Sequence, residues 1–192
     1  VVISSGTEYL FYIIFKLFNN KIYGLENPCH KMFKELFLTN NISFKAISLD
    51  ENGIVIDDLK KNNVNIAYVT PSHQFPTGAI MSISRRTELL NWANENPDRY
   101  IVEDDYDSEF KYTGRPIPAL KANDINDKVI YLGSFSKSIS SAIRVSYLVL
   151  PKALLNIYQR ELPYFILFCA PKSGAIFFVL IVSIHCTIAF LV

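Results

Sequence analysis

The sequence of 192 residues is poor in cysteine and carries almost no net charge. Its three cysteines, Cys29, Cys169 and Cys186, form no C-x-x-C pair, which argues against a disulfide framework and against a structural zinc site. Nineteen basic residues against eighteen acidic ones give a formal charge of +1, so no general field attracts nucleic acid or an anionic membrane. The composition predicts a protein of the reducing cytoplasm, and any DNA contact is expected to come from another part of the protein.

The chain also lacks the features of a secretory signal at its beginning. It opens on "VVISSGTEYL" without an initiator Met, a basic n-region or a small-residue cleavage site. We therefore expect a piece of a longer protein whose start lies upstream.

Charge is scarce in the last part of the chain as well. After Tyr164, Lys172 is the only charged side chain, and the last 19 residues, 174–192, carry no formal charge. This length is just sufficient to span a bilayer. Three explanations stay open for the hydrophobic tail 163–192: a disrupted reading frame, which is favoured, a transmembrane segment with membrane association through 174–192, or buried core.

The remainder, residues 1–162, has the pattern of one α/β domain. Half of the residues of the whole chain are hydrophobic, and in this part short apolar runs alternate with helix-patterned stretches, which indicates parallel strands joined by crossover helices. The predicted strands, rich in β-branched and aromatic residues, are 65–70, 100–104, 129–134 and 145–150. The predicted helices are 8–18, 29–39, 84–95 and 151–161. Ser84 is the expected N-cap of the third helix, and Pro151 suits the first turn of the last.

Polar side chains follow three of these strands at the point where each strand ends. Glu103, Asp104 and Asp105 end one apolar run, the segment from Ser134 to Lys137 ends another, and 70–77 follows a third. In open α/β sheets, ligands bind outside the carboxyl ends of the strands. We therefore expect these three clusters to lie at one rim and to form a binding site.

The chemistry of this rim suits one ligand in particular. A lysine at a strand end, partly desolvated and near other cationic groups, can attack a carbonyl group, which gives Lys137 a candidate role. Ser134, Ser136 and Arg144 suit a phosphate, and so does the turn "SSGTEYL", because a helix that begins there directs free N–H groups at an anion. A ligand with both an aldehyde and a phosphate is pyridoxal 5'-phosphate, whose ring nitrogen requires a carboxylate such as Asp104.

Each of these residues also has an ordinary structural interpretation. Taken alone, Lys137 is more often a solvated surface residue, Asp104 a strand-end cap, and Arg144 an ion-pair partner. The turn "ISSGTE" alone fits many helix N-termini. It is their order along one predicted edge that favours the cofactor site.

A long stretch of the chain resembles a known family. Residues 68–151, with "HQFPTG" and "EDDYDSEF", are similar to the aminotransferase-like domain of MocR/GabR-type transcriptional regulators, which belong to the fold type I pyridoxal-phosphate enzymes. "VVISSGTEYL" and "YGLENPCHKMF" extend the likeness to residues 1–162. The resemblance implies a three-layer α/β fold with a mostly parallel sheet, namely an incomplete large domain of a fold type I transferase.

The resemblance also implies a role for each matched residue. Lys137 would form a Schiff base with pyridoxal 5'-phosphate, Asp104 would pair with the pyridine nitrogen, and Tyr106 would hydrogen-bond the cofactor's phenolic oxygen. The expected phosphate ligands are Gly6, Thr7, Ser134, Ser136 and Arg144. No metal is expected.

The chain departs from the family pattern at several positions. His30 stands where an aromatic ring is expected over the cofactor, and Met32 where members that bind an amino-acid carboxylate can carry arginine. A thioether cannot pair with a carboxylate. Phe75 replaces the asparagine of the "NPTG" segment of ordinary aminotransferases, and Ser141 and Ser146 replace an expected proline and glycine around Arg144.

Three functions remain under consideration. The first is the cofactor-binding domain of a regulator that senses an amine or amino acid, dimerises when full length, and binds DNA only through a winged-helix domain outside this chain. The second is a pyridoxal-phosphate-dependent aminotransferase, against which Met32 and Phe75 weigh. The third is an inactive, membrane-associated remnant, which rests on the tail alone.

Overall fold

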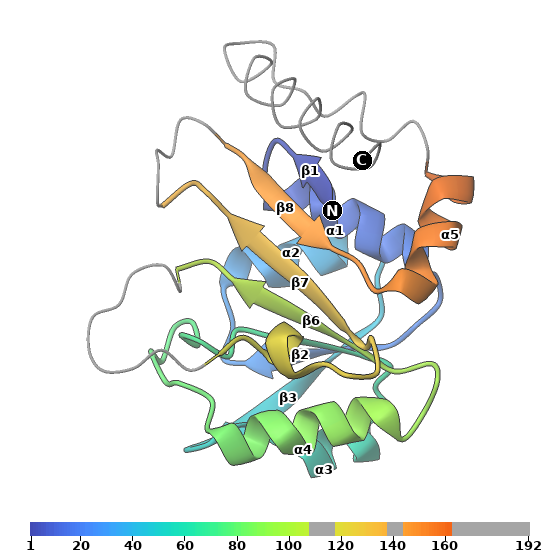
Figure 1. Cartoon of the computed structure of the whole chain (residues 1–192). Coiled ribbons are helices and arrows are strands. Elements are labelled where there is room, and N and C mark those ends of the chain that lie inside the picture. The colour runs from blue at the N-terminus through green and yellow to red at the C-terminus, as the bar shows by residue number, and fades with distance from the viewer. Residues whose placement is uncertain (108–117, 138–143, 163–192) are drawn as a thin grey trace.

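The computed structural model describes residues 1–107, 118–137 and 144–162, which form an eight-stranded sheet between two layers of helices (Figure 1). The sheet order is β1-β8-β7-β6-β5-β2-β3-β4. The strands are β1 (Val2–Ser4), β2 (Tyr23–Asn27), β3 (Phe44–Asp50), β4 (Gly53–Ile54), β5 (Ile66–Val69), β6 (Tyr100–Asp105), β7 (Val129–Ser134) and β8 (Ser146–Val149). The helices are α1 (Thr7–Leu17), α2 (Lys31–Thr39), α3 (Ile56–Lys61), α4 (Ile83–Asn94), α5 (Lys152–Glu161) and the 3₁₀ helix η1 (Leu120–Asn123). The predicted α/β fold with three layers and a mostly parallel sheet is confirmed.

The strands at the centre of the sheet run parallel, and those toward its ends do not. β3, β2, β5, β6 and β7 pair in parallel, whereas β8 is antiparallel to both β7 and β1, and β4 is antiparallel to β3. The prediction of 145–150 as one more parallel strand was therefore wrong in direction. A short apolar run looks the same in either direction, because buried strands of both kinds expose little of either face.

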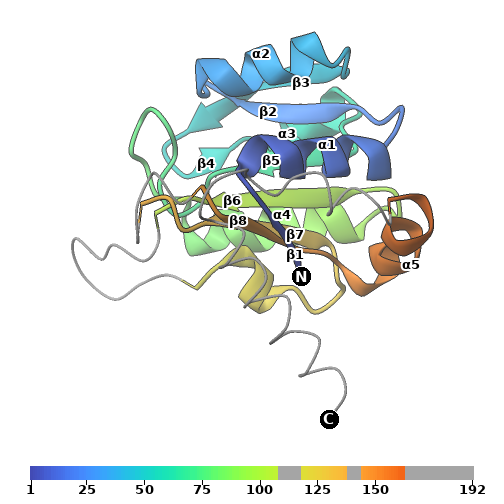
Figure 2. The same ribbon diagram turned by 90° about the horizontal axis from the view of Figure 1, so that it is seen from above.

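Side chains alternate between two hydrophobic cores, one on each face of the sheet. On β5, Ile66 and Tyr68 pack in the core beneath α1, α2 and α5, whereas Ala67 and Val69 pack in the core beneath α3 and α4. Successive residues of a strand point to opposite faces, so both faces of the central strands must be apolar. Figure 2 shows the same arrangement from above, with β1 beside β8.

The predicted helices are present with small shifts of their ends. The N-cap of α4 is Ser82, whose hydroxyl accepts a hydrogen bond from the N–H of Arg85 at 3.3 Å, so the prediction of Ser84 was wrong by two residues. Ser84 lies within the first turn of α4, where its hydroxyl contacts Glu88 instead. Pro151 is the N-cap of α5 rather than part of its first turn.

Four strands, the helix α3 and the 3₁₀ helix η1 were not expected from the sequence. β2 contains Gly24 and Glu26, and in β3 only Ile47 is buried while the other six residues are half-buried or exposed, so neither strand has the apolar character of β5 to β7. β1, β4 and α3 have only three, two and six residues. Such short elements depend on their partners in the sheet more than on their own sequence.

The hydrophobic tail 163–192, with its proposed membrane segment at 174–192, lies outside the described residues, as does Ser141. No helix in the described ranges is both long enough and apolar enough to cross a membrane. The expectation for the tail therefore stays a prediction.

The core beneath α2 offers a test of the packing. Phe37 is fully buried, and its ring contacts those of Phe15 and Tyr23 at centroid distances of 4.9 and 5.1 Å. We expect Phe37→Ala to lower the free energy of unfolding by about 3–5 kcal/mol, because it leaves a cavity in addition to the lost burial. The neighbouring Leu38 is 57% exposed, so Leu38→Ala is the matched control and should cost less than about 0.5 kcal/mol in urea denaturation. Equal losses would contradict the assigned packing.

Candidate functional site

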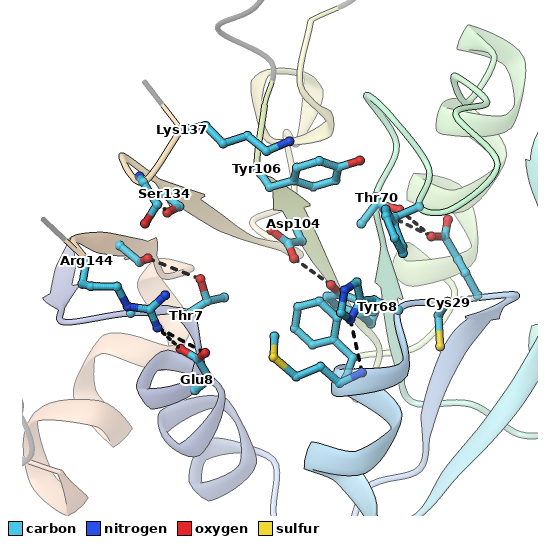
Figure 3. A pocket seen from close by; sticks show the side chains of 18 residues that line it. Thr7, Glu8, Cys29, Tyr68, Thr70, Asp104, Tyr106, Ser134, Lys137 and Arg144 are labelled. Carbon is cyan, nitrogen blue, oxygen red and sulfur yellow. Dashed lines mark hydrogen bonds and ion pairs between the residues drawn. The ribbon is translucent and has the colours of Figure 1, made fainter. Parts of the chain in front are cut away.

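A pocket opens at the carboxyl ends of β5, β6 and β7, beside the N-terminus of α1 (Figure 3). Its empty space, which includes solvent at the mouth, amounts to about 930 Å³. All nine site residues expected from the sequence line this pocket: Gly6, Thr7, His30, Asp104, Tyr106, Ser134, Ser136, Lys137 and Arg144. The three polar clusters thus lie at one rim, as the order of strands predicted.

Strand alternation selects one carboxylate from the acidic end of β6. Asp104 lies on the same face as Val102 and points toward Tyr68 of β5. Glu103 lies on the opposite face, where it accepts hydrogen bonds from the N–H groups of Leu120 and Lys121 at 2.7 and 2.9 Å. Asp105 accepts a hydrogen bond from the hydroxyl of Tyr131 at 2.7 Å. Of the three acids, Asp104 alone lines the pocket, while Glu103 and Asp105 hold neighbouring elements in place.

Asp104 is buried and has one strong hydrogen-bond donor. The hydroxyl of Tyr68 donates to its Oδ2 at 2.6 Å, and only 6% of Asp104 is exposed. Burial raises the pKa of Asp104 to about 7, although the hydrogen bond from Tyr68 opposes the shift, and the nearby charges of Asp105 and Asp107 add to it. A cationic group beside this carboxylate would favour its charged form. Tyr68 was not expected to be a site residue, because its contact with Asp104 follows from the parallel register of β5 and β6.

Lys137 projects into the pocket from the loop after β7. Its Nζ lies 4.4 Å from the centre of the Tyr106 ring and 3.5 Å from Oδ2 of Asp107. The Lys137 side chain is 53% exposed, whereas that of Asp107 is 7% exposed. Among the described residues, the charged contact of Lys137 is this carboxylate, and no cationic group is described beside its amine.

Asp107 and Tyr106 are both held by His73, which the sequence did not single out. His73 Nδ1 lies 2.7 Å from Oδ2 of Asp107, and the hydroxyl of Tyr106 donates to the backbone carbonyl of His73 at 2.6 Å. The His73 and Tyr106 rings are stacked, with centroids 6.1 Å apart. A tyrosine hydroxyl that donates one hydrogen bond can still accept another from a ligand.

The opposite end of the pocket has the properties of an anion site. Gly6 is the N-cap of α1 and has a φ of 128°, a conformation that favours glycine, and no side chain caps this helix. The hydroxyls of Thr7 and Ser146 lie 3.3 Å apart, and the N–H of Ser136 donates to the hydroxyl of Ser134 at 3.2 Å. Free N–H groups at a helix N-terminus, hydroxyls and the guanidinium of Arg144 suit a phosphate group.

A second set of buried groups joins the loops on the far side of the pocket. Glu26 accepts hydrogen bonds from the N–H and the hydroxyl of Thr70 at 3.2 and 2.7 Å. Burial raises its pKa to about 7, against the effect of these hydrogen bonds. The amide of Gln74 donates to the carbonyls of Pro28 and Phe75, so it ties the loop after β2 to the loop after β5. Glu26 was not expected from the sequence, because β2 was not predicted as a strand.

His30 lies on the loop that this network holds. Its Nδ1 accepts a hydrogen bond from the N–H of Met32 at 3.2 Å and so caps α2, and its ring is tilted against that of Phe75 with centroids 4.8 Å apart. His30, Met32 and Phe75 all line the pocket. They give its mouth a largely apolar edge that can contact a flat ring.

The residues present therefore fit a ligand with three distinct parts. An anion can bind at the end lined by Gly6 and Arg144. A protonated ring nitrogen can pair with the buried Asp104, and a carbonyl carbon can react with the amine of Lys137. A Cβ atom at Gly6 would lie 3.0 Å from Nη2 of Arg144, so only glycine leaves the anion end open.

Comparison with protein families gives one match over most of the chain. The model described as "Aminotransferase class I and II" matches residues 1–181.

The curated relatives include regulators of transcription. The chain is 44% identical over 157 residues to the uncharacterized HTH-type transcriptional regulator YdeL of Bacillus subtilis, covering 81% of this chain and 34% of YdeL. It is 30% identical over 162 residues to the probable rhizopine catabolism regulatory protein MocR of Rhizobium meliloti, covering 83% of this chain and 33% of MocR. The chain thus spans about a third of the length of these relatives.

The solved structures that it resembles include enzymes. One is LysN, an alpha-aminoadipate aminotransferase of Thermus thermophilus, solved in complex with N-(5'-phosphopyridoxyl)-L-leucine. Its TM-score is 0.70 at 28% identity, and the match covers 82% of this chain and 44% of LysN.

The shifted pKa of Asp104 predicts how stability depends on pH in the chain without ligand. Because this pKa rises from 3.8 to about 7 on folding, the folded chain retains a proton that the unfolded chain releases between these values. The carboxyl therefore contributes stability that is complete below about pH 4 and is lost as the pH rises through about 7. We expect Asp104→Asn to gain stability relative to the wild type from about pH 5 to about pH 8 in urea denaturation.

The control for this measurement is Asp58→Asn. Asp58 is partly exposed, and hydrogen bonds from Ser48 lower its pKa, so it is charged in both the folded and the unfolded state across this range. The difference in the free energy of unfolding between Asp58→Asn and the wild type should therefore not change with pH. If the free energies of unfolding of the wild type and Asp104→Asn changed with pH in the same way, the raised pKa of Asp104 would be contradicted.

Proposed function

The chain belongs to the aminotransferase class I and II family, and we propose that it is the cofactor-binding part of the aminotransferase-like domain of a MocR/GabR-type transcriptional regulator. The observation that carries this proposal is the geometry of the pocket. A buried carboxylate, a lysine amine and an anion site line one pocket at the carboxyl edge of a parallel sheet. The relatives at 44% and 30% identity are named as transcriptional regulators, which favours regulation over turnover.

Pyridoxal 5'-phosphate is the cofactor that the family and the LysN complex indicate. When bound, it supplies an aldehyde to which a primary amine can bond and a protonated ring that withdraws electrons. In this proposal, Lys137 would bond to the aldehyde carbon, and Asp104 would keep the ring nitrogen protonated. Tyr106 would hydrogen-bond the phenolic oxygen, and His30 would contact the ring face. The phosphate would be held by Gly6, Thr7, Ser134, Ser136 and Arg144, which all line the pocket.

The pocket has little with which to recognise an amino-acid carboxylate. Among its described lining residues, Arg144 is the single arginine, and it lies at the anion end. Met32, which is 45% exposed, offers no charge to a carboxylate at the apolar mouth. We therefore propose an amine, or an amino acid bound mainly through its amine, as the effector. Dimerisation and DNA binding through a winged-helix domain outside this chain complete the proposal, with the cytoplasm as its location.

The alternative function is transamination of an amino acid, which the likeness to LysN favours. In that case Lys137 must move a proton between carbon atoms of the bound molecule, and a keto acid must be released. The two functions differ in product, so they can be separated by experiment.

Formation of the covalent bond at Lys137 is the first test. Purified chain mixed with pyridoxal 5'-phosphate should absorb at roughly 410–430 nm, and borohydride should remove this band and leave a label on Lys137. Lys137→Arg keeps the charge but not the nucleophilic amine and should abolish the band. Lys152→Arg, at an exposed position on α5, is the control and should retain it. A folded wild type without the band would refute the proposed function.

The second test compares L-leucine with 3-methylbutylamine, which differs from it by the carboxylate alone. The regulator proposal predicts that both shift the absorbance band with affinities within roughly threefold of each other, because no free guanidinium is described near the mouth. It also predicts no release of 4-methyl-2-oxopentanoate. With 2-oxoglutarate added as the acceptor of the amino group, steady release of this keto acid would instead establish the aminotransferase.

Met32→Arg is the matched variant for this comparison. A guanidinium at this position of the lining can pair with the carboxylate, so the variant should favour L-leucine over the amine by roughly tenfold. An unchanged ratio would mean that the carboxylate does not approach this part of the pocket.

A further inference from the structure

The anion end of the pocket already contains an acidic side chain. Glu8 lies in the first turn of α1, and both of its carboxylate oxygens accept hydrogen bonds from Nη2 of Arg144, at 3.1 and 3.2 Å. Both residues line the pocket, and Figure 3 shows the pair beside Thr7. The guanidinium that would bind a phosphate is thus engaged by a residue of the chain itself.

The ion pair occupies the space next to the helix N-terminus. A Cβ atom built at Gly6 would lie 2.9 Å from Oε2 of Glu8 and 3.0 Å from Nη2 of Arg144. The carboxylate therefore lies beside the N-cap of α1, where the helix favours negative charge. A phosphate that uses the same donors must share this space with Glu8 or displace it.

The charges at this end are balanced before any ligand arrives. Arg144 contributes one positive charge and Glu8 one negative charge, and among the residues that the structure describes no other charged side chain lines this end of the pocket. A phosphate bound there brings further negative charge, which the Glu8 carboxylate repels. The side chains of Glu8 and Arg144 are 37% and 53% exposed, so the carboxylate can turn into solvent.

We propose that the Glu8 carboxylate competes with the phosphate group of the ligand for Arg144 and the N-terminus of α1. It thereby lowers the affinity of the site for pyridoxal 5'-phosphate. This inference rests on the proposed function, and it assigns to Glu8 the control of cofactor retention. The effect is specific for the phosphate, because Glu8 lies at the anion end and not beside Lys137 or Asp104. Pyridoxal without the phosphate should therefore bind independently of Glu8.

The experiment compares Glu8→Gln with the wild-type chain. Glutamine keeps the size of the side chain and removes its charge. We expect the dissociation constant for pyridoxal 5'-phosphate, measured from the absorbance band, to fall roughly three- to tenfold, and that for pyridoxal to stay unchanged. Inorganic phosphate should compete more strongly against the cofactor in the variant.

The matched control is Glu88→Gln. Glu88 is also a half-exposed glutamate paired with an arginine, Arg85, but it lies on α4 and not in the pocket. The Glu88→Gln variant should bind pyridoxal 5'-phosphate, pyridoxal and inorganic phosphate with the affinities of the wild type. A dissociation constant for pyridoxal 5'-phosphate that is unchanged or higher in Glu8→Gln would overturn the inference, and so would equal changes for pyridoxal and its phosphate.

A second measurement separates this inference from the proposed function. Inorganic phosphate at about 10 mM should raise the melting temperature of Glu8→Gln more than that of the wild type, and this shift requires no reaction at Lys137. If neither chain forms the absorbance band, the proposed function fails, and the phosphate shift alone decides the role of Glu8. Equal shifts in the two chains would then refute it.

Discussion

The candidate site depends on one buried hydrogen bond, from the hydroxyl of Tyr68 to the carboxyl of Asp104 at 2.6 Å. It joins side chains of two adjacent parallel strands on the face covered by α1 and α2. A buried acid without a partner is costly, and the hydroxyl supplies the donor that water no longer provides. Because the register of β5 and β6 places the two side chains together, the sheet itself fixes the centre of the pocket. The lysine and the anion end are then arranged around that centre by loops.

Much of this arrangement could be predicted from the sequence because it follows from local pattern. The apolar runs at 65–70, 100–104 and 129–134 are buried strands, and polar residues follow each of them. In a parallel sheet the ends of such strands share one edge, so their polar residues meet. The antiparallel direction of β8 could not be read in this way, since it depends on pairing with β1 and β7 across the fold.

The partners of the site residues were harder to predict than the residues themselves. Glu8, Glu26, His73 and Asp107 are joined to the site by contacts between segments distant in sequence, such as Glu8 with Arg144. The spacing of hydrophobic residues along the chain does not predict such contacts. The choice of Asp104 over Glu103 and Asp105 depends on strand alternation, which becomes certain only once the faces of β6 are assigned to their cores.

The strand β1 has a consequence for the order in which the chain acquires its structure. β1 pairs with β8, and Thr7 contacts Ser146, a separation of 139 residues. Contacts between such distant segments form slowly, because the intervening chain must first lose its freedom. During synthesis the segment that contributes Gly6 and Thr7 emerges early and must wait for β8. We therefore expect the anion end of the pocket to form late in folding, after the central parallel strands, so that the chain can hold a phosphate only once its sheet is complete.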